Sequence, residues 1–306
     1  MSNLSRRNFI GAAGLAAASL SIRAEETRDL AAFQKELDAI TPNDYKAFQL
    51  PGMDLPDADR LAAYAAFPGL KRYDTAFDKV FAEIQSTTVT DRPAIWYVYN
   101  MGVVVKTAQA LFTIDVNHRQ ATRLEPILDF ALITHNHHDH YSDRFLDAMD
   151  RAGKTVVSNF DDNYGAHRGK RMPGGYTRAE KTFNLKGVTV KTSLSDHNPY
   201  LIDFTTAFEI TIGDYTIYHS GDSQNIDKLN PSRTPDLWIV HPRCGLKVAA
   251  GIEKFHPRKT VIAHLFELGH AVNRWRWSVA DGQAEVRKVN EAGAAAVMPL
   301  WGDRIA

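Results

Sequence analysis

The sequence contains a single cysteine and has no excess of either charge. Because Cys244 stands alone, the chain cannot form an intramolecular disulfide, a cysteine-rich zinc site or a dithiol redox motif. The 36 lysines and arginines balance the 36 aspartates and glutamates, so we expect no general polyanion binding and no nucleic-acid partner. A metal site in this chain has to use histidine, aspartate or glutamate.

The chain also lacks an apolar run long enough to cross a membrane, which takes ~20 residues. Its most apolar stretch, GAAGLAAASLSIRA at 11–24, follows Arg6 and Arg7 and precedes Glu25. A positive segment, a short apolar run and a small residue at its end predict a cleaved signal peptide over residues 1–24. We therefore expect no stable membrane span in the mature protein.

The same segment resembles the twin-arginine export signal. Its S-R-R-x-F-[LI] pattern is matched by Ser5, Arg6, Arg7, Phe9 and Ile10. The resemblance implies the twin-arginine export machinery as a partner, export of a folded and metal-loaded protein, and a periplasmic location. An ordinary secretory signal with two chance arginines is the alternative.

Residues 25–90 show helical periodicity and carry no obvious chemistry. Apolar residues recur at helix spacing in TRDLAAFQKELDAI (27–40) and YDTAFDKVFAEI (73–84). Proline and glycine are frequent between these two segments, which predicts a loop. We expect a helical extension packed on the main domain, and the alternative is a lid or a substrate-selecting wall.

From residue 91 onward the periodicity is that of short strands. Runs rich in β-branched and aromatic residues predict strands at 94–100, 102–107, 110–116 and 130–134. A helix-like piece lies at 124–130, and Ser142 is the candidate N-cap of a helix that ends at Gly153. After residue 222 strands and helices alternate, which indicates an α/β domain over 91–306.

The stretch THNHHDHYSD at 134–143 directly follows a predicted strand. In an extended segment His135 and His137 point the same way, so both imidazoles can reach one metal ion. Asp139 and His140 point elsewhere and can reach a second ion if the loop turns there. The bland alternative for this stretch taken alone is a solvated polar loop.

Three further donors each follow a predicted strand: His197 in SLSDHN, Asp222 in IYHSGDS and His264 in VIAHLF. Strand ends gather side chains from distant parts of the sequence, because the strands fix the positions of the loops. Imidazole nitrogens and carboxylate oxygens are natural ligands of zinc and similar ions. The combination therefore predicts a metal site.

At these residues the chain resembles the metallo-β-lactamase superfamily. His135-x-His137-x-Asp139-His140 matches its H-x-H-x-D-H signature, LFTIDV resembles the strand before that signature, and HSGDS resembles a later turn. The resemblance covers about 91–306. It implies an α/β (α+β) fold, a four-layer αβ/βα sandwich in which two mixed sheets face each other, helices lie outside and metals sit at one edge.

Carried over by position, the resemblance implies two divalent metal ions. Zinc is the default, and manganese or iron also suits a site of nitrogen and oxygen donors. The implied ligands of the first ion are His135, His137 and His197. Those of the second ion are Asp139, His140 and His264, and Asp222 bridges the two.

This ligand set resembles that of hydrolases with two metal ions, such as lactonases, phosphodiesterases, glyoxalase II and ribonuclease Z. It implies that a hydroxide held between two ions cleaves a lactone, ester or phosphodiester bond of a small-molecule substrate, with Asp139 orienting that hydroxide. Zinc β-lactamases lack the aspartate at position 222, and the di-iron oxygen-reducing members carry glutamate in place of His137. The alternatives are a β-lactamase or thioester hydrolase, a mononuclear iron enzyme resembling persulfide dioxygenase, and a non-catalytic metal-binding module.

The other histidines receive structural interpretations. We expect the side chain of His138 to point away from the ions. Surface or structural roles are expected for His118, His167 and His256, and packing or a supporting hydrogen bond for His219. Two alternatives stay open at the remaining positions: an ordinary loop or substrate contact for His241, Arg243 and Cys244, and a pocket lining or core packing for His270, Trp275 and Trp277.

Overall fold

The computed structural model describes residues 29–158, 175–176, 180–271 and 274–306. The predicted signal peptide over 1–24 and His167 lie outside these ranges. Among the described residues, no helix combines the length and the apolar character needed to cross a membrane.

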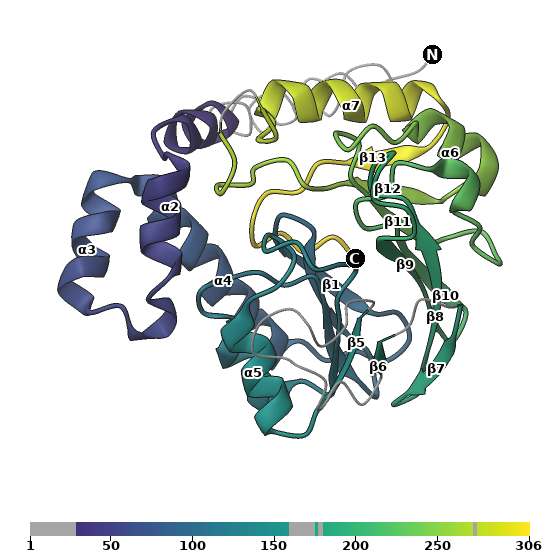
Figure 1. The fold of residues 1–306 in the computed structure, drawn as a ribbon, viewed down its shortest axis with the longest axis horizontal. Coiled ribbons are helices and arrows are strands. Elements are labelled where there is room, and N and C mark those ends of the chain that lie inside the picture. Colours follow the sequence, from purple (N-terminus) through teal and green to yellow (C-terminus); the bar gives the residue numbers. More distant parts are fainter. Residues whose placement is uncertain (1–28, 159–174, 177–179, 272–273) are drawn as a thin grey trace, which may run out of the picture.

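Two β-sheets form the centre of the molecule, and helices lie on their outer sides (Figure 1). In the first sheet the strands follow the chain order, antiparallel up to β3 and parallel from β3 to β6. Its strands are β1 (Ala94–Tyr99), β2 (Gly102–Lys106), β3 (Leu111–Ile114), β4 (Phe130–Leu132), β5 (Thr155–Ser158) and β6 (Gly175–Tyr176).

The second sheet has the order β13-β12-β11-β10-β9-β8-β7. Its antiparallel strands are β7 (Thr182–Leu185), β8 (Val188–Ser195), β9 (Thr205–Ile212) and β10 (Tyr215–His219). The parallel strands that follow β10 are β11 (Leu237–Val240), β12 (Lys259–Ile262) and β13 (Ala295–Val297). The carboxyl ends of β10, β11 and β12 therefore meet at one edge of this sheet.

Helices cover each sheet on the side away from the other sheet. The first sheet packs against α4 (Pro68–Ser86), which contacts β1, and α5 (Asp143–Arg151), which contacts β5. On the second sheet α7 (Val279–Glu291) contacts β12 and β13, and α6 (Val248–Phe255) lies beside it. The predicted four-layer αβ/βα sandwich is confirmed.

The region before β1 is more helical than the sequence predicted. The loop expected between its two helical segments is wrong, because α2 (Pro42–Gln49), the 3-10 turn η1 (Gly52–Asp54) and α3 (Asp57–Ala66) occupy it. Pro42 is the first residue of α2, where proline needs no hydrogen bond, and Thr41 and Asp44 form a capping box. These residues begin a helix instead of interrupting one.

In the same region, α4 is joined to the β-sandwich by a buried polar contact. His118 stacks between Tyr73 and Phe77 of α4, with ring centroids 3.9 and 4.3 Å away. The neighbouring Arg119 guanidinium pairs with the buried carboxylate of Asp74. The structural role expected for His118 is thus observed, and residues 29–86 share one hydrophobic core with the sandwich.

Candidate metal centre

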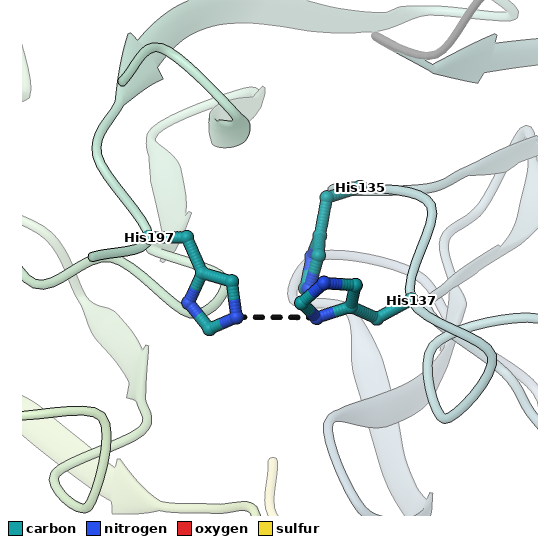
Figure 2. A group of neighbouring side chains, drawn as sticks. All are labelled: His135, His137 and His197. Atoms are coloured by element: carbon teal, nitrogen blue, oxygen red, sulfur yellow. Dashed lines mark hydrogen bonds between the residues drawn. The ribbon is translucent and has the colours of Figure 1, made fainter. Parts of the chain in front are cut away.

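Three histidines meet at the edge between the two sheets. His135 and His137 lie in the loop after β4, and His197 lies just after β8 (Figure 2). His197 Nε2 is 3.1 Å from His137 Nδ1, and the His135 ring lies 4.6 Å from that of His137. The three imidazoles offer nitrogens within 4.8 Å of one another, a spacing suited to a single ion.

A second group lies on the other half of the same loop. A turn, closed by His140 N–H donating to the His137 carbonyl at 3.0 Å, separates the two halves. His264 follows β12, and its Nε2 lies 2.9 Å from Asp139 Oδ2. Asp139, His140 and His264 form a group whose ligand atoms also lie within 4.8 Å of one another.

Asp222 connects the two groups. Its Oδ2 lies 3.9 Å from His135 Nε2, 3.3 Å from His140 Nε2 and 3.6 Å from His264 Nε2. The turn that places it depends on Gly221, whose φ is +53° and where a Cβ would lie 2.6 Å from the Thr205 methyl group. One carboxylate oxygen therefore faces donors of both groups.

Several of these atoms are buried without a hydrogen-bond partner among the described residues. His135 Nε2, His140 Nε2 and Asp222 Oδ1 are in this state. Buried polar atoms are nearly always paired, so a cluster of unpaired ones indicates a missing partner. Nitrogen and carboxylate oxygen donors converging from separate strand ends fit divalent metal ions.

The opposite nitrogens of these imidazoles are held by hydrogen-bonding groups. Asp115 is fully buried, and its Oδ2 lies 2.9 Å from His140 Nδ1. Its two oxygens also accept hydrogen bonds from Thr134, one from the backbone N–H and one from the hydroxyl, both at 2.7 Å. Thr134 Oγ1 in turn lies 3.0 Å from His135 Nδ1. Such partners fix the tautomer that leaves Nε2 free for an ion.

Asn100 supports the second group from the turn between β1 and β2. Its Nδ2 donates to the backbone oxygen of Asp139 at 2.9 Å. The backbone carbonyl of Asn100 accepts from the backbone N–H of His264, also at 2.9 Å. Asn100, Asp115 and His264 have φ of 56°, 49° and 60°, a left-handed region that non-glycine residues rarely adopt. Strained backbone of this kind concentrates at functional sites.

The electrostatics favour metal-ligating protonation states at His135, His137 and Asp222. Burial lowers the pKa of His135 well below its usual value and that of His137 to about 4. Although burial acts to raise it, the pKa of Asp222 is held well below its usual value, chiefly by His140. Neutral imidazoles and an ionised carboxylate are the forms that bind metal. His140 differs, because the surrounding carboxylates, chiefly Asp222, raise its pKa well above its usual value although burial acts to lower it.

The remaining histidines divide as the sequence analysis expected, with one addition. His138 is exposed, His256 is exposed at the end of α6, and buried His219 lies 3.1 Å from the Met101 carbonyl. His270 is paired with Glu267, its Nδ1 lying 2.5 Å from Glu267 Oε2. The addition is His241, which the sequence left as either an ordinary loop residue or a substrate contact. It is buried, and it contacts Asp222 and His264.

Arg243 and Cys244, in the same loop as His241, are in none of the donor groups. Arg243 lies over the Trp277 ring at 5.5 Å. Burial raises the pKa of the Cys244 thiol, whose Sγ donates to the Ser223 carbonyl at 2.9 Å. The Cys244 thiol is therefore neutral and packed, which argues against a nucleophilic role.

The helices before β1 also reach the donor loop. Gln49, the last residue of α2, donates from Nε2 to Asn117 Oδ1 at 2.7 Å. Asn117 Nδ2 donates to the carbonyl of His138 at 2.8 Å, between the two halves of the loop. The roles of these two residues, and those of Asp115, Thr134 and Asn100, could not be predicted from the sequence, because they depend on contacts between distant segments.

Comparison with solved structures identifies the fold. A possible metal-dependent hydrolase from Veillonella parvula DSM 2008 matches with a TM-score of 0.55 and 14% identity, over 69% of this chain and 98% of that one. Igni18, a metallo hydrolase from Ignicoccus hospitalis, matches with a TM-score of 0.53 and 18% identity, over 70% of this chain and 97% of that one. The metallo-β-lactamase fold protein YhfI from Bacillus subtilis matches with a TM-score of 0.51 and 16% identity, over 70% of this chain and 99% of that one.

No protein-family model and no curated protein sequence matches the chain. At these identities the structural matches establish the architecture, and this architecture is the metallo-β-lactamase fold. Together with the donor groups, the fold defines the class of the molecule: a protein of the metallo-β-lactamase fold with a cluster of side chains that could hold metal at the edge of its sandwich.

Proposed function

We propose that this chain is a metal-dependent hydrolase that binds two divalent ions. The observation that carries the proposal is the position of Asp222, whose Oδ2 faces buried and otherwise unpaired Nε2 atoms of His135 and His140. A structural histidine cluster would pair those nitrogens with protein groups. A carboxylate that lies between two groups of imidazole and carboxylate donors is instead the arrangement that a pair of cations stabilises.

The two groups divide the ligands. His135, His137 and His197 are the proposed ligands of the first ion, and Asp139, His140 and His264 those of the second, with Asp222 between them. When bound, two such ions supply a water with a pKa lowered toward neutrality and a positive charge for the oxygen of the scissile group. Zinc is our first expectation for both ions.

Asp139 is the proposed catalytic carboxylate. Its Oδ2 lies 2.9 Å from His264 Nε2 and accepts a hydrogen bond from Asn100 Nδ2 at 3.2 Å. Asp139 is also less buried than Asp222, so it is the carboxylate of the cluster that an attacking water reaches more easily. Fixed by these contacts, it can orient that water and accept its proton.

The substrates that suit this chemistry carry a carbonyl or phosphoryl centre. We propose a lactone, ester or phosphodiester, because these bonds are cleaved by attack of water on a centre whose oxygen is polarised.

The motif at residues 5–10 further supports export by the twin-arginine route. A protein loaded with metal before export would suit that route.

Metal analysis of two single variants tests the proposal. We expect His137→Ala to reduce bound metal and to abolish hydrolysis, whereas His138→Ala, a change at the exposed neighbour, leaves both unchanged. Elemental analysis of the purified protein gives stoichiometry and identity, and a panel of lactones, phosphodiesters and β-lactams gives turnover. Full metal content and full turnover in the His137 variant would sink the assignment.

The same panel separates the alternatives. Stoichiometric metal without turnover of any substrate would favour a binding module. Oxygen uptake with a persulfide would favour an iron enzyme. Dominant β-lactam turnover would favour a β-lactamase.

A further inference from the structure

One buried histidine of the cluster has no place in the proposed ligand set. His241 follows β11, which lies between β10, the strand before Asp222, and β12, the strand before His264. Because these three strands are parallel, their carboxyl ends bring the three side chains to one edge. The position of His241 therefore results from the sheet order.

The contacts of His241 are specific. Its ring is stacked on that of His264, with centroids 3.8 Å apart and an interplanar angle of 6°. Its Nδ1 lies 3.2 Å from Asp222 Oδ1, the carboxylate oxygen that does not face the other imidazoles. Neither His241 ring nitrogen makes a hydrogen bond to a described residue in this conformation, and neither does Asp222 Oδ1, although Nδ1 and Oδ1 lie within hydrogen-bonding distance of each other.

Direct ligation of an ion by His241 is the competing role, because the group of donors to which it belongs could itself hold an ion. Asp139, His140 and His264 form one group of mutually close donor atoms, and His241 is not a member of it. His241 is grouped only with Asp222 and His264. The separation of 3.2 Å between His241 Nδ1 and Asp222 Oδ1 is within hydrogen-bonding distance, and a reorientation of the ring or the carboxylate would align an Nδ1 proton with that oxygen.

We propose that His241 is a positioning residue that donates a hydrogen bond from Nδ1 to Asp222 Oδ1 and so directs Oδ2 toward both donor groups. This inference rests on the proposed metal centre. A carboxylate between two ions can rotate unless its second oxygen is held, and buried Asp222 has no other donor for that oxygen among the described residues.

Two substitutions of similar size separate the hydrogen bond from the ring stacking. In His241→Asn the amide nitrogen takes approximately the place of Nδ1 and keeps a donor there, but the ring is lost. In His241→Phe the ring on His264 is kept and the donor is lost. Metal affinity is measured by competition with a chelator, and the geometry at the ions by the visible spectrum of the cobalt-substituted protein.

We expect His241→Phe to weaken binding of the more loosely held ion about 10- to 100-fold and to change the cobalt spectrum, because loss of a supporting partner has effects of this size. His241→Asn should stay within about threefold of the wild type. Equal losses in both variants would overturn the proposal in favour of direct ligation, and unchanged affinity in His241→Phe would overturn it in favour of stacking alone. Circular dichroism verifies that each variant is folded.

The wild-type titration keeps this test separate from that of the proposed function. A wild-type protein that binds no ion contradicts the metal centre itself. A wild-type protein that binds two ions, with no loss in the Phe variant, contradicts only the role of His241.

Discussion

Asp115→Asn replaces a fully buried carboxylate by an amide of the same shape and changes the tautomer of a proposed ligand. Thr134 N–H is a fixed donor 2.7 Å from Asp115 Oδ1, so the amide oxygen has to remain on that side. The amide NH2 then replaces Oδ2, which lies 2.9 Å from His140 Nδ1. His140 either faces a second donor or moves its proton to Nε2, the nitrogen that faces Asp222.

The magnitude follows from these contacts. A buried donor left without an acceptor costs about 1–3 kcal/mol, which is the expected loss in the free energy of unfolding of the metal-free protein. Loss of a partner behind a metal-bound histidine lowers metal affinity about 10- to 100-fold, equivalent to about 1.4–2.8 kcal/mol. The effect should concern the second ion, because His140 belongs to its donor group.

Calorimetric titration of the metal-free protein with zinc measures this effect, and urea unfolding measures the loss of stability. Asp129→Asn is the matched control. Asp129 Oδ2 also accepts a hydrogen bond from a backbone N–H, that of Leu111 at 2.9 Å, but Asp129 belongs to none of the groups of metal-donor residues. The control should bind both ions as the wild type does. A folded Asp115→Asn protein with two ions bound at wild-type affinity would refute the tautomer argument.

Two further predictions concern the contact between α4 and the sandwich. Arg119→Met should lower the free energy of unfolding by about 3–5 kcal/mol in urea, because the buried Asp74 carboxylate loses its cation and keeps only the Tyr64 hydroxyl as a donor among the described residues. Adding Asp74→Leu should restore part of the loss. No recovery in the double variant would contradict this. Burial lowers the pKa of His118 to about 3. Between that value and 6.5 the unfolded chain binds a proton that the folded chain does not, so stability falls as the pH falls. From pH 7.5 to pH 5 the wild type should lose about 2 kcal/mol more than His118→Gln in chelator-treated urea unfolding, and parallel losses would be contrary.

The donor residues were accessible from the sequence because their placement depends on local features. Alternate spacing in His135-x-His137 and a strand ending just before each donor are both visible in one dimension. The structure brings all seven predicted ligands into overlapping groups at one edge. The edge could be predicted without the strand order, because the carboxyl ends of parallel strands lie at the same edge of a sheet.

The supporting residues were not accessible in the same way. Asp115 lies in LFTIDV, a segment the sequence analysis read as a strand, and only its contact with His140 shows its role. The contact of His241 with Asp222 requires β11 to lie between β10 and β12, which depends on tertiary structure. The helices α2 and α3 were predicted as a loop because proline is frequent in turns and also at the first position of a helix, and composition alone does not separate the two.

The hydrogen bonds from Gln49 through Asn117 to the His138 carbonyl have a consequence for how such a protein can change. The segment before β1 forms part of the support of the loop that bears both donor groups. Exchanging that segment for another, in evolution or by design, would therefore disturb the loop that bears the donor groups. A variant library confined to α2 should accordingly shift metal affinity.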